Sequence, residues 1–580
     1  MPSHISVAGC IVLGLALAAG HAAADPVQRR IIALSGTDGP LGPGLGPGVV
    51  FSPTGLAGPT LDEDGDVAFR GVLSGPGVTS QNNQGIWLDR DETLTLLLRT
   101  RDPVPAAAID AYVSGIHPSK WTLSRDGRLS VIGTVRLPTT GSNLSAAWTE
   151  VDNELGLIAL QSQAAPGADA GSTFRAFDWI TGGLGGAAAF EATLDSPRGV
   201  LDGIWTYCDG VLSAVAIEGQ EAPVPGMTYL AISSYDYQPA INAAGMLGFL
   251  AYLVQPGSPS AAGILVESAG ATIPIALEQT VAPDTDGLAS FQFLHDPPTL
   301  NDAGHVAFRA SLQGPGVEDL TRHGIWSDRT GALGLVVRTG DAAPGLGPDG
   351  VFTYVEYPGL NDSDEILFYG FDSNQLINGY WRHDGAAITP VVIDETHPAG
   401  TPAGIRLDVR LESGMINNAG QSAIFAGFET SDGDSGAYDT GLWIVGRTGS
   451  QVLGMRVGQH IEIESGDIRI IARITSLRLH PSPQAGLPRS FNDDGTIVAS
   501  ALFTDGSSAI IAATPVSFCS ADTNGDGFVD FADLNEVLGA FNSVVLGPAY
   551  DFDADLDLDG AVGFADLNLV LSQLGDDCGG

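Results

Sequence analysis

The residues with the clearest chemical meaning lie in two short acidic stretches near the C-terminus. In the first, oxygen-bearing side chains alternate along the chain at Asp522, Asn524 and Asp526, and Gly527 follows them. Oxygen ligands at positions 1, 3 and 5, a glycine at 6, a backbone carbonyl at 7 and an acid at 12 are the pattern of a calcium loop. The second stretch repeats this order from Asp555. The sequence therefore predicts two bound Ca²⁺ ions.

Each predicted calcium ion has its own set of ligands. Those of the first are Asp522, Asn524, Asp526, the carbonyl of Phe528, Asp530 and Asp533. Those of the second are Asp555, Asp557, Asp559, the carbonyl of Ala561 and Asp566. Position 9 of the second loop is Gly563, so water must serve there and the second site is expected to be weaker.

Both loops have Asp at position 12, where an EF-hand has Glu, and each is followed by one amphipathic helix but not preceded by a good one. Two such loops, with Asp555 lying 33 residues after Asp522, resemble a type I dockerin domain. The resemblance covers residues 519–580. It implies a calcium-dependent module of residues 518–580 that attaches an extracellular bacterial protein to a cohesin-like partner domain.

The resemblance also implies a docking face, and the positions of two cysteines predict a disulfide. The pairs Phe531-Ala532 and Phe564-Ala565 stand just before the position-12 acids, where dockerins contact cohesins, often with small hydroxylated residues. Here both copies are Phe-Ala, so binding to ordinary cohesins is in doubt; the alternative is that both Phe side chains pack inside the module or against the rest of the chain. Cys519 and Cys578 bracket the module and are expected to form a disulfide, which leaves Cys208 as a buried free thiol.

The N-terminus and the charge indicate an exported protein. Residues 5–24 are apolar and end in Ala22-Ala23-Ala24, which is typical of a signal peptide, residues 1–24. The formal net charge is −43, so the surface repels nucleic acid and anionic membranes. No other stretch is long and apolar enough to be a transmembrane helix. We expect a secreted protein.

The long middle region, residues 25–517, repeats one unit about every sixty residues. A first signature, apolar-Asn-x-x-Gly-x-apolar-Ala-Phe, is clearest at Leu300–Phe308, and a second, Gly-Ile-Trp, follows it, as at Trp326. A third, Gly-Asp-x-Ala-Pro-Gly, ends at Gly345 in the clearest copy. Asn-x-x-Gly is typical of a tight hairpin turn, and four short strands per unit is the size of a propeller blade. Asp364 replaces the turn glycine in one copy, and Asp tolerates that backbone conformation.

The repeat count predicts the architecture. Eight copies, with the missing third signature of the last copy supplied by Arg30–Pro40, predict a mainly β, eight-bladed β-propeller closed by its N-terminal strand, plus the small α-helical calcium-binding module. A solenoid or tandem sandwiches is the alternative. The repeat resembles a family of bacterial secreted proteins built from tandem Asn-x-x-Gly-x-x-Ala-Phe units with varied C-terminal anchors, a resemblance that implies no settled activity.

Three functions remain open. The first is a calcium-binding repeat protein that presents a scaffold or a surface for a polysaccharide or cell-surface ligand. The second is a polysaccharide-degrading glycoside hydrolase, which would need two or three carboxylates converging near the propeller axis. The third is a structural matrix protein.

Other chemistry finds little support. Gly433-Asp434-Ser435-Gly436 resembles a serine protease loop but lacks that family's partner motif, and the histidines form no close metal-binding pair; His305 is predicted to be a solvated turn residue. Asp62–Asp66 is predicted to be a turn rather than a calcium site. Six of eight tryptophans share one repeat position and are expected in the core, which leaves Trp121 and Trp179 for a sugar site.

Overall fold

The computed structural model describes most of residues 27–578. The residues it does not describe within that span are 106–109, 153, 233–238, 286, 400, 402–404, 410–413, 430–438, 448, 465, 477–488, 517, 518, 520, 524–527, 545–553, 557–560, 576 and 577. The predicted signal peptide and the Gly433–Gly436 motif lie outside the described residues. In the described part of the chain, no helix has both the length and the apolar character needed to cross a membrane.

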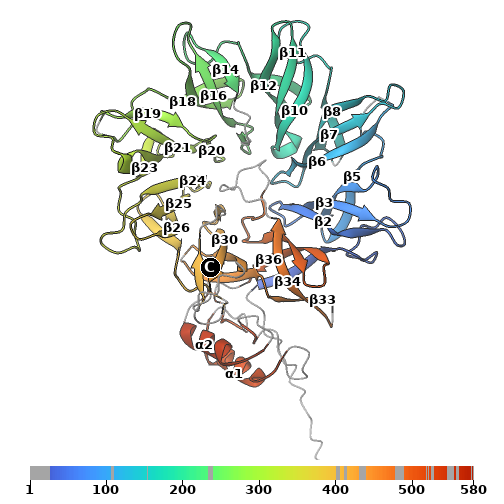
Figure 1. Ribbon diagram of the computed structural model, residues 1–580, viewed down its shortest axis with the longest axis vertical. Coiled ribbons are helices and arrows are strands. Elements are labelled where there is room, and N and C mark those ends of the chain that lie inside the picture. Colours follow the sequence, from blue (N-terminus) through green and yellow to red (C-terminus); the bar gives the residue numbers. More distant parts are fainter. Residues whose placement is uncertain are drawn as a thin grey trace, which may run out of the picture.

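Eight antiparallel sheets surround a central axis as the blades of a propeller (Figure 1). Blade 1 is β2 (Val50–Leu61), β3 (Val67–Ser74), β4 (Gln84–Arg90) and β5 (Thr93–Arg99). Blade 2 is β6 (Tyr112–Leu123), β7 (Leu129–Arg136), β8 (Asn143–Val151) and β9 (Glu154–Leu160). Blade 3 is β10 (Thr173–Gly182), β11 (Ala188–Ser196), β12 (Gly199–Cys208) and β13 (Val211–Ile217). Blade 4 is β14 (Thr228–Ile232), β15 (Ala240–Ile241), β16 (Leu247–Val254), β17 (Ala261–Ser268) and β18 (Ala271–Leu277).

The second half of the ring continues the same order. Blade 5 is β19 (Ser290–Leu294), β20 (Thr299–Leu300), β21 (Val306–Gln313), β22 (His323–Ser327) and β23 (Gly334–Arg338). Blade 6 is β24 (Tyr354–Leu360), β25 (Ile366–Asp372), β26 (Ile377–His383) and β27 (Ile388–Ile393). Blade 7 is β28 (Arg406–Asp408), β29 (Gly414–Ile416), β30 (Ser422–Glu429), β31 (Asp439–Val445) and β32 (Gln451–Arg456).

Blade 8 joins the two ends of the repeat region. It contains β33 (His460–Glu464), β34 (Asp467–Ser476), β35 (Ile497–Phe503), β36 (Ser508–Pro515) and the N-terminal strand β1 (Val27–Leu34). Strand β1 pairs with β36 from Val27 opposite Pro515 to Leu34 opposite Ala509. The predicted eight-bladed ring and its closure by the N-terminal strand are confirmed, and the solenoid is excluded.

The tryptophans of the second signature fill the cores of the blades, as predicted. Trp87, Trp148, Trp205, Trp326, Trp381 and Trp443 are all buried. Most of them also donate a hydrogen bond to the third signature: the indole N–H of Trp381, for example, lies 2.8 Å from the carbonyl of Pro344. Trp87 makes this bond to Pro43, in the segment that follows β1, so the N-terminal segment does supply the third signature that the last copy lacks.

The Asn-x-x-Gly turns interlock around the axis. In blade 5, the side-chain oxygen of Asn301 accepts the amide of His305 in its own turn, and the side-chain Nδ2 donates to the carbonyl of Asn361 in blade 6 at 3.1 Å. The same side-chain bond to the next blade runs from Asn242, Asn361, Asn417 and Asn492. Five hydrogen bonds thus connect six consecutive blades, from blade 4 through blade 8 to blade 1. The turns have the predicted left-handed position, including Asp364 with φ 61°.

Blade 1 has Asp62 in place of the asparagine. Its Oδ1 accepts the amides of Asp64 and Asp66 at 3.0 and 2.8 Å, which confirms the predicted turn. Its other oxygen faces the turn of blade 2, where a Cβ on Gly127 would come within 2.4 Å of it. A carboxylate has no hydrogen to donate in the way that asparagine Nδ2 does. Burial and the charge of Asp66 raise the pKa of Asp62 to about 7.

We predict that Asp62→Asn stabilises the protein in a pH-dependent way. A carboxyl group whose pKa is higher in the folded state than its ordinary value of 3.8 stabilises the fold fully only in acid, and this contribution is lost as the pH rises from about 4 to 7. The variant should gain about 1–3 kcal/mol in free energy of unfolding at pH 8 and almost nothing at pH 4. Thermal unfolding at the two pH values measures this, with the exposed Asp64→Asn as control. An equal effect at both pH values would contradict it.

We also predict that the ring needs β1. Deleting residues 25–40 removes the buried side chains of Val27, Ile32 and Leu34 and exposes the edge of β36. The loss should be about 5 kcal/mol, from roughly 1.5–3 kcal/mol per buried aliphatic side chain, and the bare edge should promote aggregation. Thermal unfolding and size-exclusion chromatography against a chain lacking only residues 1–24 are the measurements. An unchanged melting temperature would show that closure by β1 is dispensable.

Candidate functional sites: the axis, the C-terminal module and a pocket between blades

Carboxylates from several blades converge on the propeller axis around one arginine. Arg125, in the turn of blade 2, lies 3.0 Å from Glu63, 2.9 Å from Asp302, 3.1 Å from Asp362 and 2.9 Å from Asp493. These acids come from blades 1, 5, 6 and 8. Each acid also accepts the backbone amide of the equivalent residue in a neighbouring blade, as Asp302 Oδ1 does from Ala243 at 2.8 Å.

This axial cluster was not predicted. Acidic residues are common at turn positions, so the types of these residues do not indicate a cluster, and their convergence depends on the closed ring. The signal was a charge reversal: the repeat position that holds Glu63, Asp302, Asp362 and Asp493 holds Arg125 in the degenerate copy of blade 2. The carboxylates do converge as a propeller glycosidase would need, but they are hydrogen-bonded to Arg125 and to backbone amides, so the cluster ties blades together.

The C-terminal module contains two equivalent halves. Its helices, α1 (Phe531–Ala540) and α2 (Phe564–Gln573), lie outside the ring of blades (Figure 1). The segment after each helix bonds to the loop of the other half: the amide of Gly575 lies 2.7 Å from the carbonyl of Val529, and that of Asn542 lies 2.8 Å from the carbonyl of Val562. The structure contains the Cys519–Cys578 disulfide, with the two Cα atoms 5.2 Å apart.

The first and last acids of both predicted calcium loops are buried. Asp522 and Asp533 are 0% exposed, and Asp555 and Asp566 are 1% exposed. Residues 519–580 include thirteen Asp and Glu residues and no Lys, Arg or His. Burying a carboxylate is costly unless an opposite charge or hydrogen bonds compensate. Backbone amides supply some of these hydrogen bonds. The amide of Asp530 donates to the carboxylate of Asp533 at 2.7 Å, and the amide of Gly563 donates to that of Asp566 at 2.6 Å.

Three of the other predicted ligands, Phe528, Asp530 and Ala561, are among the described residues. Asp530 caps helix α1 by accepting the amide of Ala532 at 2.6 Å. Asn524, Asp526, Asp557 and Asp559 lie outside the described residues. Among the described residues, no three His, Cys, Asp or Glu side chains are grouped as metal ligands. The buried carboxylates, in a module without basic residues, fit a bound cation.

The predicted docking residues are at the surface. Phe531 is 69% exposed and Phe564 is 72% exposed, so neither fills the core of the module. Leu538 and Leu571, each seven residues further along its helix, are also exposed. Residues seven apart share a helix face, so the two helices present equivalent Phe/Leu faces. The ring of Phe564 contacts Phe541, with centroids 5.0 Å apart.

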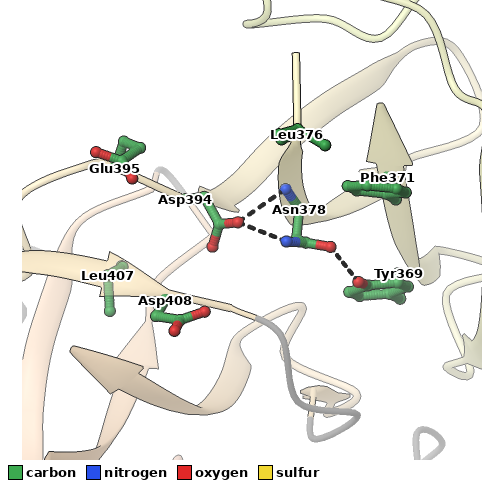
Figure 2. Close-up of a pocket in the computed structure, with 8 residues that line it drawn as sticks. All are labelled: Tyr369, Phe371, Leu376, Asn378, Asp394, Glu395, Leu407 and Asp408. Atoms are coloured by element: carbon green, nitrogen blue, oxygen red, sulfur yellow. Dashed lines mark hydrogen bonds between the residues drawn. The ribbon is translucent and has the colours of Figure 1, made fainter. Parts of the chain in front are cut away.

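A pocket of about 440 Å³ lies between blades 6 and 7 (Figure 2). It is lined by Tyr369, Phe371, Leu376, Asn378, Asp394, Glu395, Leu407 and Asp408. Strand β25 starts at the turn near the axis and ends at this pocket, so the pocket lies at the opposite end of the blade from the axial cluster. The hydroxyl of Tyr369 donates to Asn378, whose side-chain amide lies 2.6 Å from Asp394 (Figure 2).

Asp394 has a structural role in this pocket. Its Oδ2 accepts the backbone amide of Asn378 at 2.9 Å, and its Oδ1 accepts that of Val409 in blade 7. In other blades a side-chain oxygen at the same repeat position also accepts a backbone amide of the neighbouring strand. Thr339 accepts the amide of His323 at 3.1 Å, and Glu278 accepts that of Ala262 at 2.9 Å. Burial and the nearby charge of Asp408 raise the pKa of Asp394. The aromatic, amide and carboxylate groups of the pocket suit a polar ligand with an apolar face.

Several other predictions are corrected. Cys208 is exposed rather than buried, because it ends β12 at an outer turn. Trp121 and Trp179 are buried, so they form no sugar platform: each is packed in a core and donates its indole N–H, to Pro118 and Glu191 respectively. His305 is not a purely solvated residue, since its Nδ1 lies 2.8 Å from Asp364 in the next blade.

The fold and the repeat turns define an eight-bladed repeat propeller. The chain belongs to DUF7453, a family of unknown function, whose model matches residues 32–183 and 184–517. A comparison with curated proteins finds no match.

Solved propellers are similar at a low level. The propeller domain of the Trilobed protease from Pyrococcus furiosus has 10% identity and a TM-score of 0.32, over 69% of this chain and 96% of that chain. Penicillium chrysogenum alpha-L-arabinanase complexed with arabinobiose has 8% identity and a TM-score of 0.23, over 59% of this chain and 93% of that chain. Chaetomium thermophilum Sqt1, bound to the N-terminus of the ribosomal protein L10, has 9% identity and a TM-score of 0.29, over 79% of this chain and 96% of that chain. These similarities are too low to bear on function.

Proposed function

We propose that this protein is an extracellular propeller that presents a ligand-binding surface and is attached to a larger complex by a calcium-dependent, dockerin-like module. The observation that carries the proposal is the set of four buried aspartates, Asp522, Asp533, Asp555 and Asp566, in a module with no basic residue. A divalent cation in each loop supplies the charge that these carboxylates need.

Each calcium ion would be held by one loop. The first loop offers Asp522, Asn524, Asp526, Phe528, Asp530 and Asp533, and the second offers Asp555, Asp557, Asp559, Ala561 and Asp566. When bound, the ion neutralises the acids and fixes the start of the following helix. The residues of the chain do the rest: Asp530 caps α1, and the disulfide holds the two ends of the module together.

The exposed helix faces support attachment to a partner domain. Phe531 with Ala532 and Phe564 with Ala565 occupy equivalent places at the start of α1 and α2. Exposed aromatic side chains of this size commonly mark protein-binding surfaces. Because the two faces are equivalent, a cohesin-like partner could engage either one. The ligand of the propeller would be a polysaccharide or a cell-surface group; a glycoside hydrolase activity stays an alternative prediction from the sequence.

We predict that the full chain binds two calcium ions and that the module unfolds without them. Isothermal titration calorimetry should give a stoichiometry near two, and Asp533→Ala should remove one site, because it deletes the position-12 ligand of the first loop. EDTA should remove the melting transition of the module and leave that of the propeller. Asn535→Ala, on the exposed side of α1, is the control. A stoichiometry of zero, or a module unaffected by EDTA, would refute calcium binding.

We predict two alternative docking faces on the module. In a calcium-containing pull-down of the native secretome with the full chain, a specific partner should be kept by Phe531→Ser or Phe564→Ser alone and lost in the double variant, because either equivalent face suffices. EDTA should release it. Val211→Ser, which changes an exposed apolar residue of the propeller, is the control. Loss of the partner in either single variant would show that one face is required.

A further inference from the structure

The interface between blades 5 and 6 holds buried polar atoms without partners in the described part of the chain. They are His295 Nε2, Arg309 Nε, Ser311 Oγ and His323 Nδ1. Arg309 is 8% exposed and Ser311 is 2% exposed. Buried polar groups are nearly always hydrogen-bonded, so four unpartnered atoms in one place require an explanation.

The strand register brings these residues together. Ser311 of β21 pairs directly with His323 of β22, and Arg309 lies two residues earlier on the same face of β21. The amide of His295 donates to the carbonyl of Arg309 at 3.2 Å, and the rings of His295 and His323 have centroids 5.9 Å apart. All four side chains therefore belong to one cluster, which we call the blade 5/6 cluster.

Strand β24 of blade 6 covers the cluster. The guanidinium of Arg309 lies 4.9 Å from the ring centroid of Tyr354, and Tyr354 lies 6.4 Å from the ring of His323. Glu356 forms an ion pair with Nη1 of Arg309. This pairing leaves the Nε hydrogen of the guanidinium unused.

The pocket between blades 6 and 7 occupies the equivalent place one repeat later. Tyr369 follows the repeat phenylalanine as Arg309 does, and Asn378 precedes the Gly-x-Trp signature as His323 does. There the polar side chains bond to one another, from Tyr369 to Asn378 and from Asn378 to Asp394. The fold can thus satisfy these positions internally, so the unpartnered atoms of the blade 5/6 cluster are not a requirement of the propeller.

The chemistry of the cluster favours an anion. All four unpartnered atoms can present an N–H or O–H donor, and one belongs to a guanidinium. Burial and the charge of Arg309 lower the pKa of both histidines, that of His295 to about 4. A neutral imidazole next to a permanent positive charge is poorly placed for a metal cation, while an anion would be stabilised by the same charge.

We propose that the blade 5/6 cluster binds a carboxylate group through Arg309, Ser311, His295 and His323. The ring of Phe293, which is 53% exposed, lies beside His295 with centroids 6.4 Å apart. It offers an apolar face next to the donors, which suits the ring of an acidic sugar. The carboxylate can come from such a sugar or from a small free acid. The acidic-sugar form rests on the binding role proposed above and names its ligand class.

Calorimetry on the full chain tests the proposal with glucuronate, acetate and glucose as probes. Glucuronate should bind and glucose should not, because only the former carries the anion. Acetate binding as tightly as glucuronate would support the carboxylate site and overturn the sugar. Binding of glucose equal to that of glucuronate, or tighter binding of Zn²⁺ at these histidines, would overturn the carboxylate site. The glucuronate titration is repeated in EDTA; unchanged affinity separates this site from the calcium module.

Two variants identify the residues. Ser311→Ala and His323→Asn, which copies the blade 6 residue, should each weaken glucuronate binding about tenfold or more. Ser311→Ala should do so without lowering the melting temperature, because its Oγ has no partner in the described part of the chain. Tyr369→Phe is the matched control: it also removes one hydroxyl, but a partnered one, so it should lower stability and leave glucuronate affinity unchanged. Variants that lower stability and leave affinity unchanged would assign the cluster a structural role.

The pH dependence gives an independent readout. The charge of Arg309 acts on both histidines, and that of Arg322 acts on His323. The ring of Tyr354 packs near that of His323, and Glu356 forms its ion pair with Arg309. A bound anion favours the protonated imidazoles, so glucuronate should bind more tightly at pH 5.5 than at pH 8, with proton uptake from the buffer. His323→Asn should reduce this pH dependence. Affinity that does not change between these pH values would overturn protonation of the histidines on binding and leave their neutral N–H groups as the donors.

Discussion

The hydrogen bond from each turn asparagine to the next blade is the interaction on which the ring depends. In the described part of the chain no strand belongs to two blades, so side-chain packing and bonds such as these fix the angle between neighbouring blades. Asparagine suits the position because its oxygen holds its own turn while its nitrogen reaches the next one, as Asn301 does. In the turns of blades 1, 5, 6, 7 and 8 the second residue adds a carboxylate or amide oxygen that accepts a neighbouring backbone amide. The axial end of the propeller is therefore fixed.

The opposite end of the blades is free to vary. At the blade 6/7 pocket the polar side chains satisfy one another, and at the blade 5/6 cluster they do not. The same strand positions thus carry Tyr369 and Asn378 in one place and Arg309 and His323 in the other. A rigid axial ring permits this, because substitutions at the far ends of the strands do not disturb the turns that hold the blades in register.

The repeat signatures made the propeller predictable, since their information is local. The turn that Asn361 holds and the core that Trp381 fills each lie within one blade, so both residues could be recognised from spacing alone. The axial cluster depends on contacts across the ring, such as Arg125 with Asp493, which lie far apart in the sequence. His295, Arg309 and His323 have no diagnostic spacing, and only the pairing of β21 with β22 brings two of them together. The predicted burial of Cys208 was wrong because the exposure of a residue at a strand end depends on the turn that follows it.

The pairing of β1 with β36 limits when the ring can close during translation. Of the propeller strands, the outermost strand of blade 8 emerges first from the ribosome, and its partner β36 emerges last. Loop closure over such a separation is slow compared with hairpin formation, so the other blades can form before the ring shuts. Strand β1 therefore has an unpaired edge while the seven other blades are synthesised. Only a chain that has been translated as far as residue 515 can close the ring. Closure therefore requires that the whole propeller has been synthesised.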